Sequence, residues 1–302
     1  MVKVFVRLKG GLGNQLFQWY FAHTLPATLF VPEVSSFSHT DSQRPRRLEL
    51  APVFETCNHF DKRGLSRNGH HARSPAIISL LARMWGNTVL RQLSETLGYV
   101  RDDFFTEVNV SAVQKRRIVY LDGYFQDFRL IKDIYPTISK EMKPILEKKL
   151  KVLKQLHKIP KSFDVIHVRR ADFIGALKNY AHIGILNDSW FRENYVNNSN
   201  FLIILSEDKE ECRELVEYFE PHLVLDGTNS TPWDVLTLLT YAENSIGSNS
   251  TLSWWGALMS RMNGNSFVMP DNWSWRNNVE NQRFFIEGIN YRPSIWFEKD
   301  SM

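Results

Sequence analysis

Strand-like runs alternate with helix-like runs along most of the chain, and this alternation constrains the fold more than any other feature. The strand-like runs are short and rich in Val, Ile, Leu and Phe, and polar or glycine-containing turns follow them. A chain that alternates in this way predicts an α/β fold, with parallel sheets covered by helices on both faces. The runs are Val2–Leu8, Arg117–Leu121, Phe163–Val168, Phe201–Leu205, Leu223–Leu225, Ser245–Gly247 and Ser266–Met269.

A lysine-rich segment, Ser139–Lys161, separates the first strand-like runs from the later ones. Leucines at 146, 150, 153 and 156 give it a partial apolar stripe, which predicts an amphipathic basic helix. A chain of 302 residues is expected to form about two domains. We therefore predict domains at 1–155 and 156–302, with a last helix that can cross back. The basic face of the helix is either a solvated surface or a surface attracted to anionic lipid head groups.

Composition and charge exclude several classes of protein. The chain is 43% hydrophobic and 23% charged, which is ordinary for a globular protein, and its net charge of +4 is too small for a typical nucleic-acid binder. This mild charge suits an anionic substrate or an acidic membrane surface. The cysteines, Cys57 and Cys212, have no metal-binding spacing. No run of about 18 apolar residues and no signal peptide is present, so we expect a cytoplasmic protein that can contact the inner face of a bacterial membrane.

The sharpest motif is His167-Val168-Arg169-Arg170-Ala171-Asp172-Phe173, which follows a predicted strand. Ligands of open α/β sheets bind at such strand ends. Two adjacent arginines suit a diphosphate, because guanidinium groups can bind phosphate oxygens in pairs. Asp172 either orients an arginine or accepts a proton. Without other motifs the segment would be read as a surface ion-pair cluster.

Three further segments carry candidate ligand contacts. Gly10, Gly11 and Gly13 with Asn14 and Gln15 follow the first strand, and this loop is either an anion-binding turn or a tight strand-to-helix connection. Ser206-Glu207-Asp208 could bind a ribose or a guanine, act as a base, or stabilise a helix N-terminus. Asn249, Ser250 and Thr251 open a helix and offer hydroxyl and amide groups to an anion.

Taken together, GGLGNQLFQ, DGYFQ, HVRRADF, LSEDKEEC and SNSTLSWWGA occur in the order seen in glycosyltransferase family 11. They extend from residue 10 to residue 257, and the chain resembles the bacterial α-1,2-fucosyltransferases of that family. The resemblance implies a GT-B fold of two Rossmann-like domains facing a central cleft. It also implies inverting, metal-independent transfer of L-fucose from GDP-β-L-fucose to the 2-hydroxyl of a terminal galactoside, without a cofactor.

The resemblance assigns residues to roles. His167, Arg169, Arg170 and Asp172 match the catalytic motif. Donor-binding matches are Gly10, Gly11, Gly13, Asn14, Gln15, Ser206, Glu207, Asp208, Asn249, Ser250 and Thr251. Two positions depart from the family pattern, because Ala171 replaces a glycine and Glu207 replaces an aspartate. The second change puts in doubt any role that needs an aspartate there.

Other functions remain open at this stage. The chain could transfer another GDP-sugar, because a diphosphate site does not read the sugar. It could also be a non-catalytic glycan-binding protein, although such a protein has no need for paired arginines at a strand end. We find no D-x-D motif in a strand context and no His or Cys cluster for a metal ion, so the arginines would stabilise the leaving diphosphate. The expected partners are GDP-fucose and a galactose-terminated glycan that can be lipid-linked, as in O-antigen synthesis.

Overall fold

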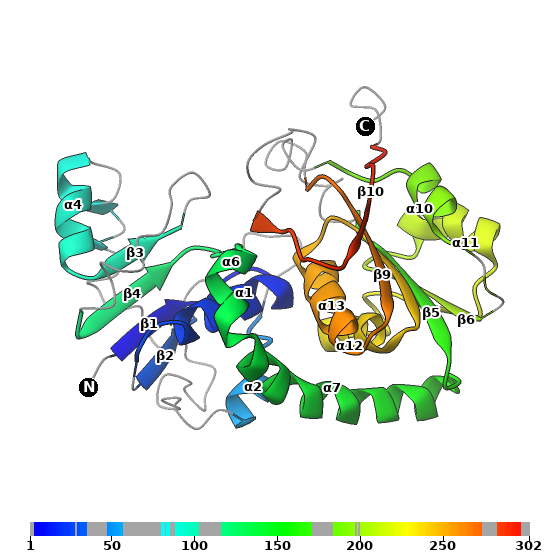
Figure 1. Ribbon diagram of the computed structural model, residues 1–302, viewed down its shortest axis with the longest axis horizontal. Helices are drawn as coiled ribbons and strands as arrows, with labels where there is room; N and C mark the ends of the chain where they lie inside the picture. Colours follow the sequence, from blue (N-terminus) through cyan, green and yellow to red (C-terminus); the bar gives the residue numbers. More distant parts are fainter. Residues whose placement is uncertain are drawn as a thin grey trace. The chain divides into compact units, whose positions relative to one another are not determined.

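The chain forms two compact units, Met1–Met142 and Lys143–Met302. The division lies within the long helix α7 (Tyr135–His157), before the predicted boundary at residue 155. Each unit contains its own parallel β-sheet (Figure 1). A last helix that crosses back stays a prediction, because residues 297–302 lie outside the described part of the chain. The computed structural model describes residues 3–27, 29–34, 47–56, 80–81, 83–84, 88–102, 116–170, 184–196, 198, 200–273 and 283–296.

The sheet of the first unit has the order β2-β1-β4-β3, and all of its strand pairs are parallel. Side chains of β1 alternate between buried and partly exposed positions, with Val4 and Val6 in the core. Strands β2 and β3 were not predicted. Pro32 in β2 is tolerated because β2 is an edge strand. The strands are β1 (Lys3–Arg7), β2 (Leu29–Glu33), β3 (Tyr99–Arg101) and β4 (Ile118–Asp122). The helices are α1 (Leu12–His23), α2 (Ala51–Thr56), α4 (Thr88–Thr96), α6 (Phe128–Ile131), η3 (Lys132–Ile134) and the start of α7.

The sheet of the second unit has the order β10-β9-β8-β5-β6-β7 and is also parallel throughout. The five strands predicted for this half, β5 to β9, are confirmed, and only β10 was not predicted. The strands are β5 (Phe163–Val168), β6 (Phe201–Ser206), β7 (Leu223–Leu225), β8 (Asn244–Gly247), β9 (Ser266–Pro270) and β10 (Asn290–Arg292). The helices are α10 (Asp188–Asn194), η4 (Glu210–Cys212), α11 (Arg213–Phe219), α12 (Pro232–Tyr241) and α13 (Thr251–Met262).

Helices cover both faces of the second sheet, as Figure 1 shows. Ile166 and Val168 of β5 pack with Trp190 of α10 and Leu215 of α11 in one hydrophobic cluster. His167 lies between them in sequence and contacts Ser253 of α13 on the other face. All six residues of β5 are buried, as expected for a central strand covered on both sides. Successive residues of β5 therefore point to opposite faces of the sheet.

Helix α7 is amphipathic, as predicted, but its leucines do not form a single buried stripe. Leu146 and Leu153 are buried, whereas Leu156 is 69% exposed. Within the described residues no helix is both long enough and apolar enough to cross a membrane.

We predict that Leu153→Ala lowers the free energy of unfolding by about 2–5 kcal/mol, because it removes buried methyl groups and leaves a cavity. The matched change Leu156→Ala, in the same helix, should alter it by no more than about 0.5 kcal/mol. Urea unfolding of both variants measures the difference. Equal destabilisation by the two changes would contradict the packing of α7 described above.

Candidate active site

Three neighbouring strands of the second unit end at one edge of the sheet, where most of the predicted site residues lie. Strand β5 pairs with β6 on one side and with β8 on the other. Because the pairs are parallel, the carboxyl ends of all three strands meet there. Arg169 follows β5, Glu207 follows β6 and Ser248 follows β8. The fold thus brings together motifs that are separated by about 40 residues or more in the sequence.

Ser248 joins β5 and β8 beyond the last paired residues of the two strands. Its Oγ donates a hydrogen bond to the carbonyl oxygen of His167 at 2.8 Å and accepts one from the backbone N–H of Arg169 at 3.1 Å. Ser248 is buried, at 1% exposure. It therefore fixes the backbone from which the Arg169 side chain projects. Sequence analysis did not select Ser248, although it lies inside a quoted motif.

His167 is buried beneath this edge and is uncharged at neutral pH. Its Nδ1 lies 2.7 Å from Oγ of Ser253 in α13. Burial, together with the positive charge of Arg169, lowers the pKa of His167 to about 3. The side chain is only 3% exposed. His167 is thus a neutral hydrogen-bonding link between β5 and α13.

Arg169 points to the edge of the sheet and remains partly exposed. One of its terminal nitrogens, Nη1, lies 3.5 Å from Oε1 of Glu207. The two side chains are 17% and 26% exposed, respectively. An arginine in this position can bind an anion at the carboxyl ends of the strands, and Glu207 can orient its guanidinium group.

Arg170 has different surroundings, although it is adjacent to Arg169 in the sequence. Its Nε and Nη2 donate to the carbonyl oxygen of Leu186, and its Nη1 donates to that of Glu211. Nη2 also forms a 2.6 Å ion pair with Asp188 at the start of α10. The residue is 5% exposed. The Arg170 guanidinium thus joins three segments of the protein, whereas Arg169 lies at the edge of the sheet.

Some polar groups in the loop after β8 form hydrogen bonds within the protein, and one has no hydrogen-bond partner among the described residues. Ser250 caps α13 by accepting a hydrogen bond from the backbone N–H of Leu252, and Thr251 is the partly exposed first residue of that helix. Asn249 donates from Nδ2 to the carbonyl oxygens of Gly184 and Trp273, at 2.8 and 3.1 Å. Its Oδ1 is buried and accepts no hydrogen bond from the described residues. This oxygen is therefore a buried acceptor that the described residues leave unsatisfied.

The acidic segment after β6, Ser206–Asp208, also contains residues that shape a turn and a residue that contacts Arg169. Ser206 Oγ donates to the carbonyl oxygen of Asp208, and a carboxylate oxygen of Asp208 accepts from the backbone N–H of Glu210. These two residues shape the turn into η4, as expected for acids at a helix N-terminus. The carbonyl oxygen of Glu207 accepts a hydrogen bond from Gly227 after β7, where a Cβ would come within 2.8 Å of that oxygen. Glu207 is the residue of the segment that contacts Arg169.

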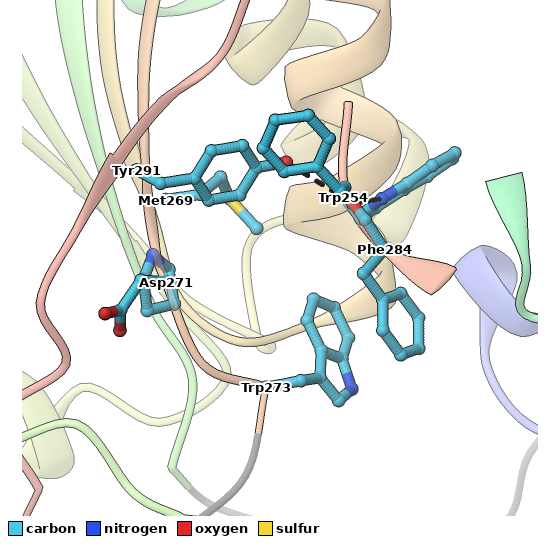
Figure 2. Close-up of a pocket in the computed structure, with 8 residues that line it drawn as sticks. Trp254, Met269, Asp271, Trp273, Phe284 and Tyr291 are labelled. Atoms are coloured by element: carbon cyan, nitrogen blue, oxygen red, sulfur yellow. Dashed lines mark hydrogen bonds between the residues drawn. The ribbon is translucent and has the colours of Figure 1, made fainter. Parts of the chain in front are cut away.

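An aromatic pocket of about 150 Å³ lies at the carboxyl end of β9 (Figure 2). Trp273 stacks on Phe284 with ring centroids 4.0 Å apart, and Phe285 stacks on Tyr291 at 5.1 Å. The carbonyl oxygen of Trp273 accepts the hydrogen bond from Asn249, so the pocket adjoins the loop after β8. Its lining consists of Trp254, Met269, Pro270, Asp271, Trp273, Phe284, Phe285 and Tyr291.

The glycine-containing loop lies in the first unit, between β1 and α1. Gly10 has a φ of +76°, and a Cβ there would lie 2.4 Å from Nδ2 of Asn14. Gln15 is fully buried, donating to the carbonyl oxygens of Gly10 and Arg47 and accepting from the N–H of Glu49. Gln15 therefore holds the glycine-containing loop against residues 47–49. The remaining two residues of the predicted set lie at the start of α1, with Gly11 as its N-cap and Gly13 inside it.

Asn14 is held by a residue that sequence analysis did not select. Gln126, which is 7% exposed, donates from Nε2 to Oδ1 of Asn14 at 2.6 Å. Nearby, the carboxylate of Asp122 accepts hydrogen bonds from Arg7, Lys9 and Tyr99. Burial alone would raise the pKa of Asp122, but these partners outweigh it, and the pKa is lowered. The quoted motif DGYFQ contained both Asp122 and Gln126, but their partners could not be found without the sheet order.

Asp172, predicted as a base or an orienting group, lies outside the described residues. Among the residues that are described, no group of three or more His, Cys, Asp or Glu side chains could hold a metal ion. Metal independence stays a prediction.

Comparison with known proteins agrees with this geometry. The sequence profile of Glycosyl transferase family 11 matches residues 81–292. The O-antigen biosynthesis glycosyltransferase WbnK of Escherichia coli is 24% identical over 294 residues, which cover 90% of this chain and 95% of WbnK. Galactoside alpha-(1,2)-fucosyltransferase 1 of Ateles belzebuth is 28% identical over 128 residues, which cover 37% of this chain and 34% of that enzyme.

A solved structure with a similar fold is that of POFUT1 in complex with GDP. The TM-score is 0.50 at 13% sequence identity, and the match covers 85% of this chain and 94% of POFUT1. Together with the two parallel sheets, this likeness confirms the predicted α/β fold of the GT-B type.

We predict that His167 contributes to the pH dependence of stability. An unfolded histidine has a pKa of about 6.5, so between about pH 6.5 and 3 the unfolded chain binds a proton that the folded protein excludes. The free energy of unfolding should therefore fall by up to about 1.4 kcal/mol per pH unit as the pH decreases through this range. His167→Gln should flatten that slope in urea titrations at several pH values. An unchanged slope in His167→Gln would show that position 167 does not exclude the proton.

Proposed function

Because the chain belongs to glycosyl transferase family 11, we propose that it transfers L-fucose from GDP-β-L-fucose to the 2-hydroxyl of a terminal galactoside, with inversion at the anomeric carbon. The observation that carries this proposal is the position of Arg169, partly exposed at the carboxyl edge of the sheet and facing Glu207. The α-1,2 linkage is supported by a relative that matches about a third of the chain, because that relative is a galactoside alpha-(1,2)-fucosyltransferase.

Arg169 serves the leaving group in this proposal. When the acceptor oxygen attacks the anomeric carbon, negative charge develops on the diphosphate that departs. The guanidinium of Arg169 binds and stabilises that charge, and Glu207 keeps it oriented. Arg170 acts indirectly, because its hydrogen bonds hold Leu186 and Glu211 beside the strand end. The chain's own cation thus takes the place that a divalent metal has in other transferases, and no cofactor is required.

The other polar groups at this edge have supporting roles. Ser248 fixes the backbone of Arg169, and the buried Oδ1 of Asn249 is available to accept a hydrogen bond from the donor substrate. His167 is buried and neutral, so it supports the strand end rather than removing the acceptor proton. Asp172, Glu207 and the leaving phosphate are the candidates for that proton, and the ion pair of Glu207 with Arg169 favours an orienting role for Glu207.

The acceptor in this proposal is a galactose-terminated glycan of a bacterial surface polysaccharide. WbnK, which matches nearly the whole chain, is an O-antigen biosynthesis glycosyltransferase. The aromatic pocket at the end of β9 suits a sugar ring, because aromatic side chains present broad apolar faces with polar edges. Its position beside Asn249 places it next to the loop proposed to bind the donor.

We predict that Arg169→Ala weakens GDP binding and lowers the transfer rate by about 10²- to 10³-fold, as loss of a donor to a developing anion does in other enzymes. Isothermal calorimetry with GDP and a transfer assay measure the two effects. Arg192→Ala, which removes a guanidinium from the surface of α10, is the matched control and should change neither. Arg170→Ala should instead lower the melting temperature. Wild-type GDP affinity and turnover in Arg169→Ala would remove this residue from the mechanism.

We also predict that transfer continues in the presence of EDTA, because Arg169 supplies the positive charge at the diphosphate. Initial rates with and without the chelator, after dialysis against it, make the comparison. Activity that disappears on chelation and returns with Mn²⁺ or Mg²⁺ would reject the metal-independent reaction while leaving the donor and acceptor open.

A further inference from the structure

One face of helix α7 exposes apolar side chains among lysines. This face, which we term the basic face, consists of Lys148, Lys151, Val152, Gln155 and Leu156. The spacing of these positions, i, i+3, i+4, i+7 and i+8, places them on one side of a helix. Val152 is 57% exposed and Leu156 is 69% exposed. The basic face thus carries apolar groups that the fold does not cover.

The opposite face of α7 already provides the packing that the fold requires. Leu146 and Leu153 on that face are buried. Lys149 forms a 2.8 Å ion pair with Asp234, the N3 residue of α12. These contacts bind α7 to the second unit, so Val152 and Leu156 are not needed for its packing.

The exposed charge around the basic face is mostly positive. Lysines are exposed at 143, 148, 151, 158 and 161, and Glu147 is the exposed acidic residue between 143 and 161. Lys154 is less available, because its Nζ donates to the carbonyl oxygen of Lys161 and lies over the ring of Phe163. A stripe with this excess of lysines attracts an anionic surface.

We propose that the basic face binds the surface of an anionic phospholipid membrane. Val152 and Leu156 would enter the boundary between head groups and acyl chains, and the lysines beside them would reach the phosphate groups. The exposed apolar pair favours a membrane over a nucleic acid, because binding to a phosphate backbone depends on charge and does not require exposed apolar groups. None of these residues belongs to the candidate active site, so the proposal is independent of the reaction.

Vesicle flotation tests this proposal with the full chain. We expect binding to phosphatidylcholine vesicles that contain phosphatidylglycerol, no binding to vesicles of phosphatidylcholine alone, and weaker binding as the salt concentration rises. The double variant Lys148→Glu/Lys151→Glu should reduce partitioning by more than about ten-fold. Val152→Ser/Leu156→Ser should also reduce it, without changing the charge.

The control is Lys132→Glu/Lys209→Glu, which makes the same change in net charge at exposed lysines away from the basic face. It should retain most of the binding. Equal losses in this control and in Lys148→Glu/Lys151→Glu would overturn the proposal, because net charge alone would then explain the attraction. Binding of single-stranded RNA that depends on Lys148 and Lys151, with no binding to either vesicle, would also overturn it. Circular dichroism of each variant verifies that α7 still folds.

Discussion

The pleat of strand β5 determines which of two adjacent arginines is buried and which is partly exposed at the edge of the sheet. Val168 and Arg170 lie on the side covered by α10, while His167 and Arg169 lie on the other side. The guanidinium of Arg170 forms hydrogen bonds to Leu186, Glu211 and Asp188, and these bonds fix the backbone at the end of β5. The partly exposed Arg169 projects from that fixed backbone. A buried arginine therefore positions a partly exposed one.

Hydrogen bonds between elements keep this edge rigid without adding charge. Ser248 links β8 to β5 on both sides of residue 168, and the neutral ring of His167 links β5 to α13 through Ser253. A protonated histidine here would place a buried positive charge next to the positive Arg169, which burial strongly disfavours. The Arg169 guanidinium and the Glu207 carboxylate therefore lie side by side at the carboxyl edge of the sheet.

The sequence predicted the fold well because strands such as β6 and β7 are largely apolar runs followed by a turn. It missed β2, β3 and β10, which are edge strands or short strands whose pairing depends on distant residues. Selecting the motifs was also possible, since functional residues follow strands in an α/β sheet. The different surroundings of Arg169 and Arg170 could not be predicted, because Asp188, the ion-pair partner of Arg170, lies 18 residues further along the chain in α10. Gln126, 112 residues from Asn14, was missed for the same reason.

We propose that the carboxyl edge of β5, β6 and β8 binds GDP-fucose, whose fucose is transferred to a galactose 2-hydroxyl. Linkage analysis of the product by NMR tests it most directly, after incubation with GDP-fucose or GDP-mannose and a panel of β-galactosides. We expect transfer from GDP-fucose alone and a product with fucose α-linked to O2 of the terminal galactose. Transfer of mannose, or attachment of fucose to another hydroxyl, would contradict it.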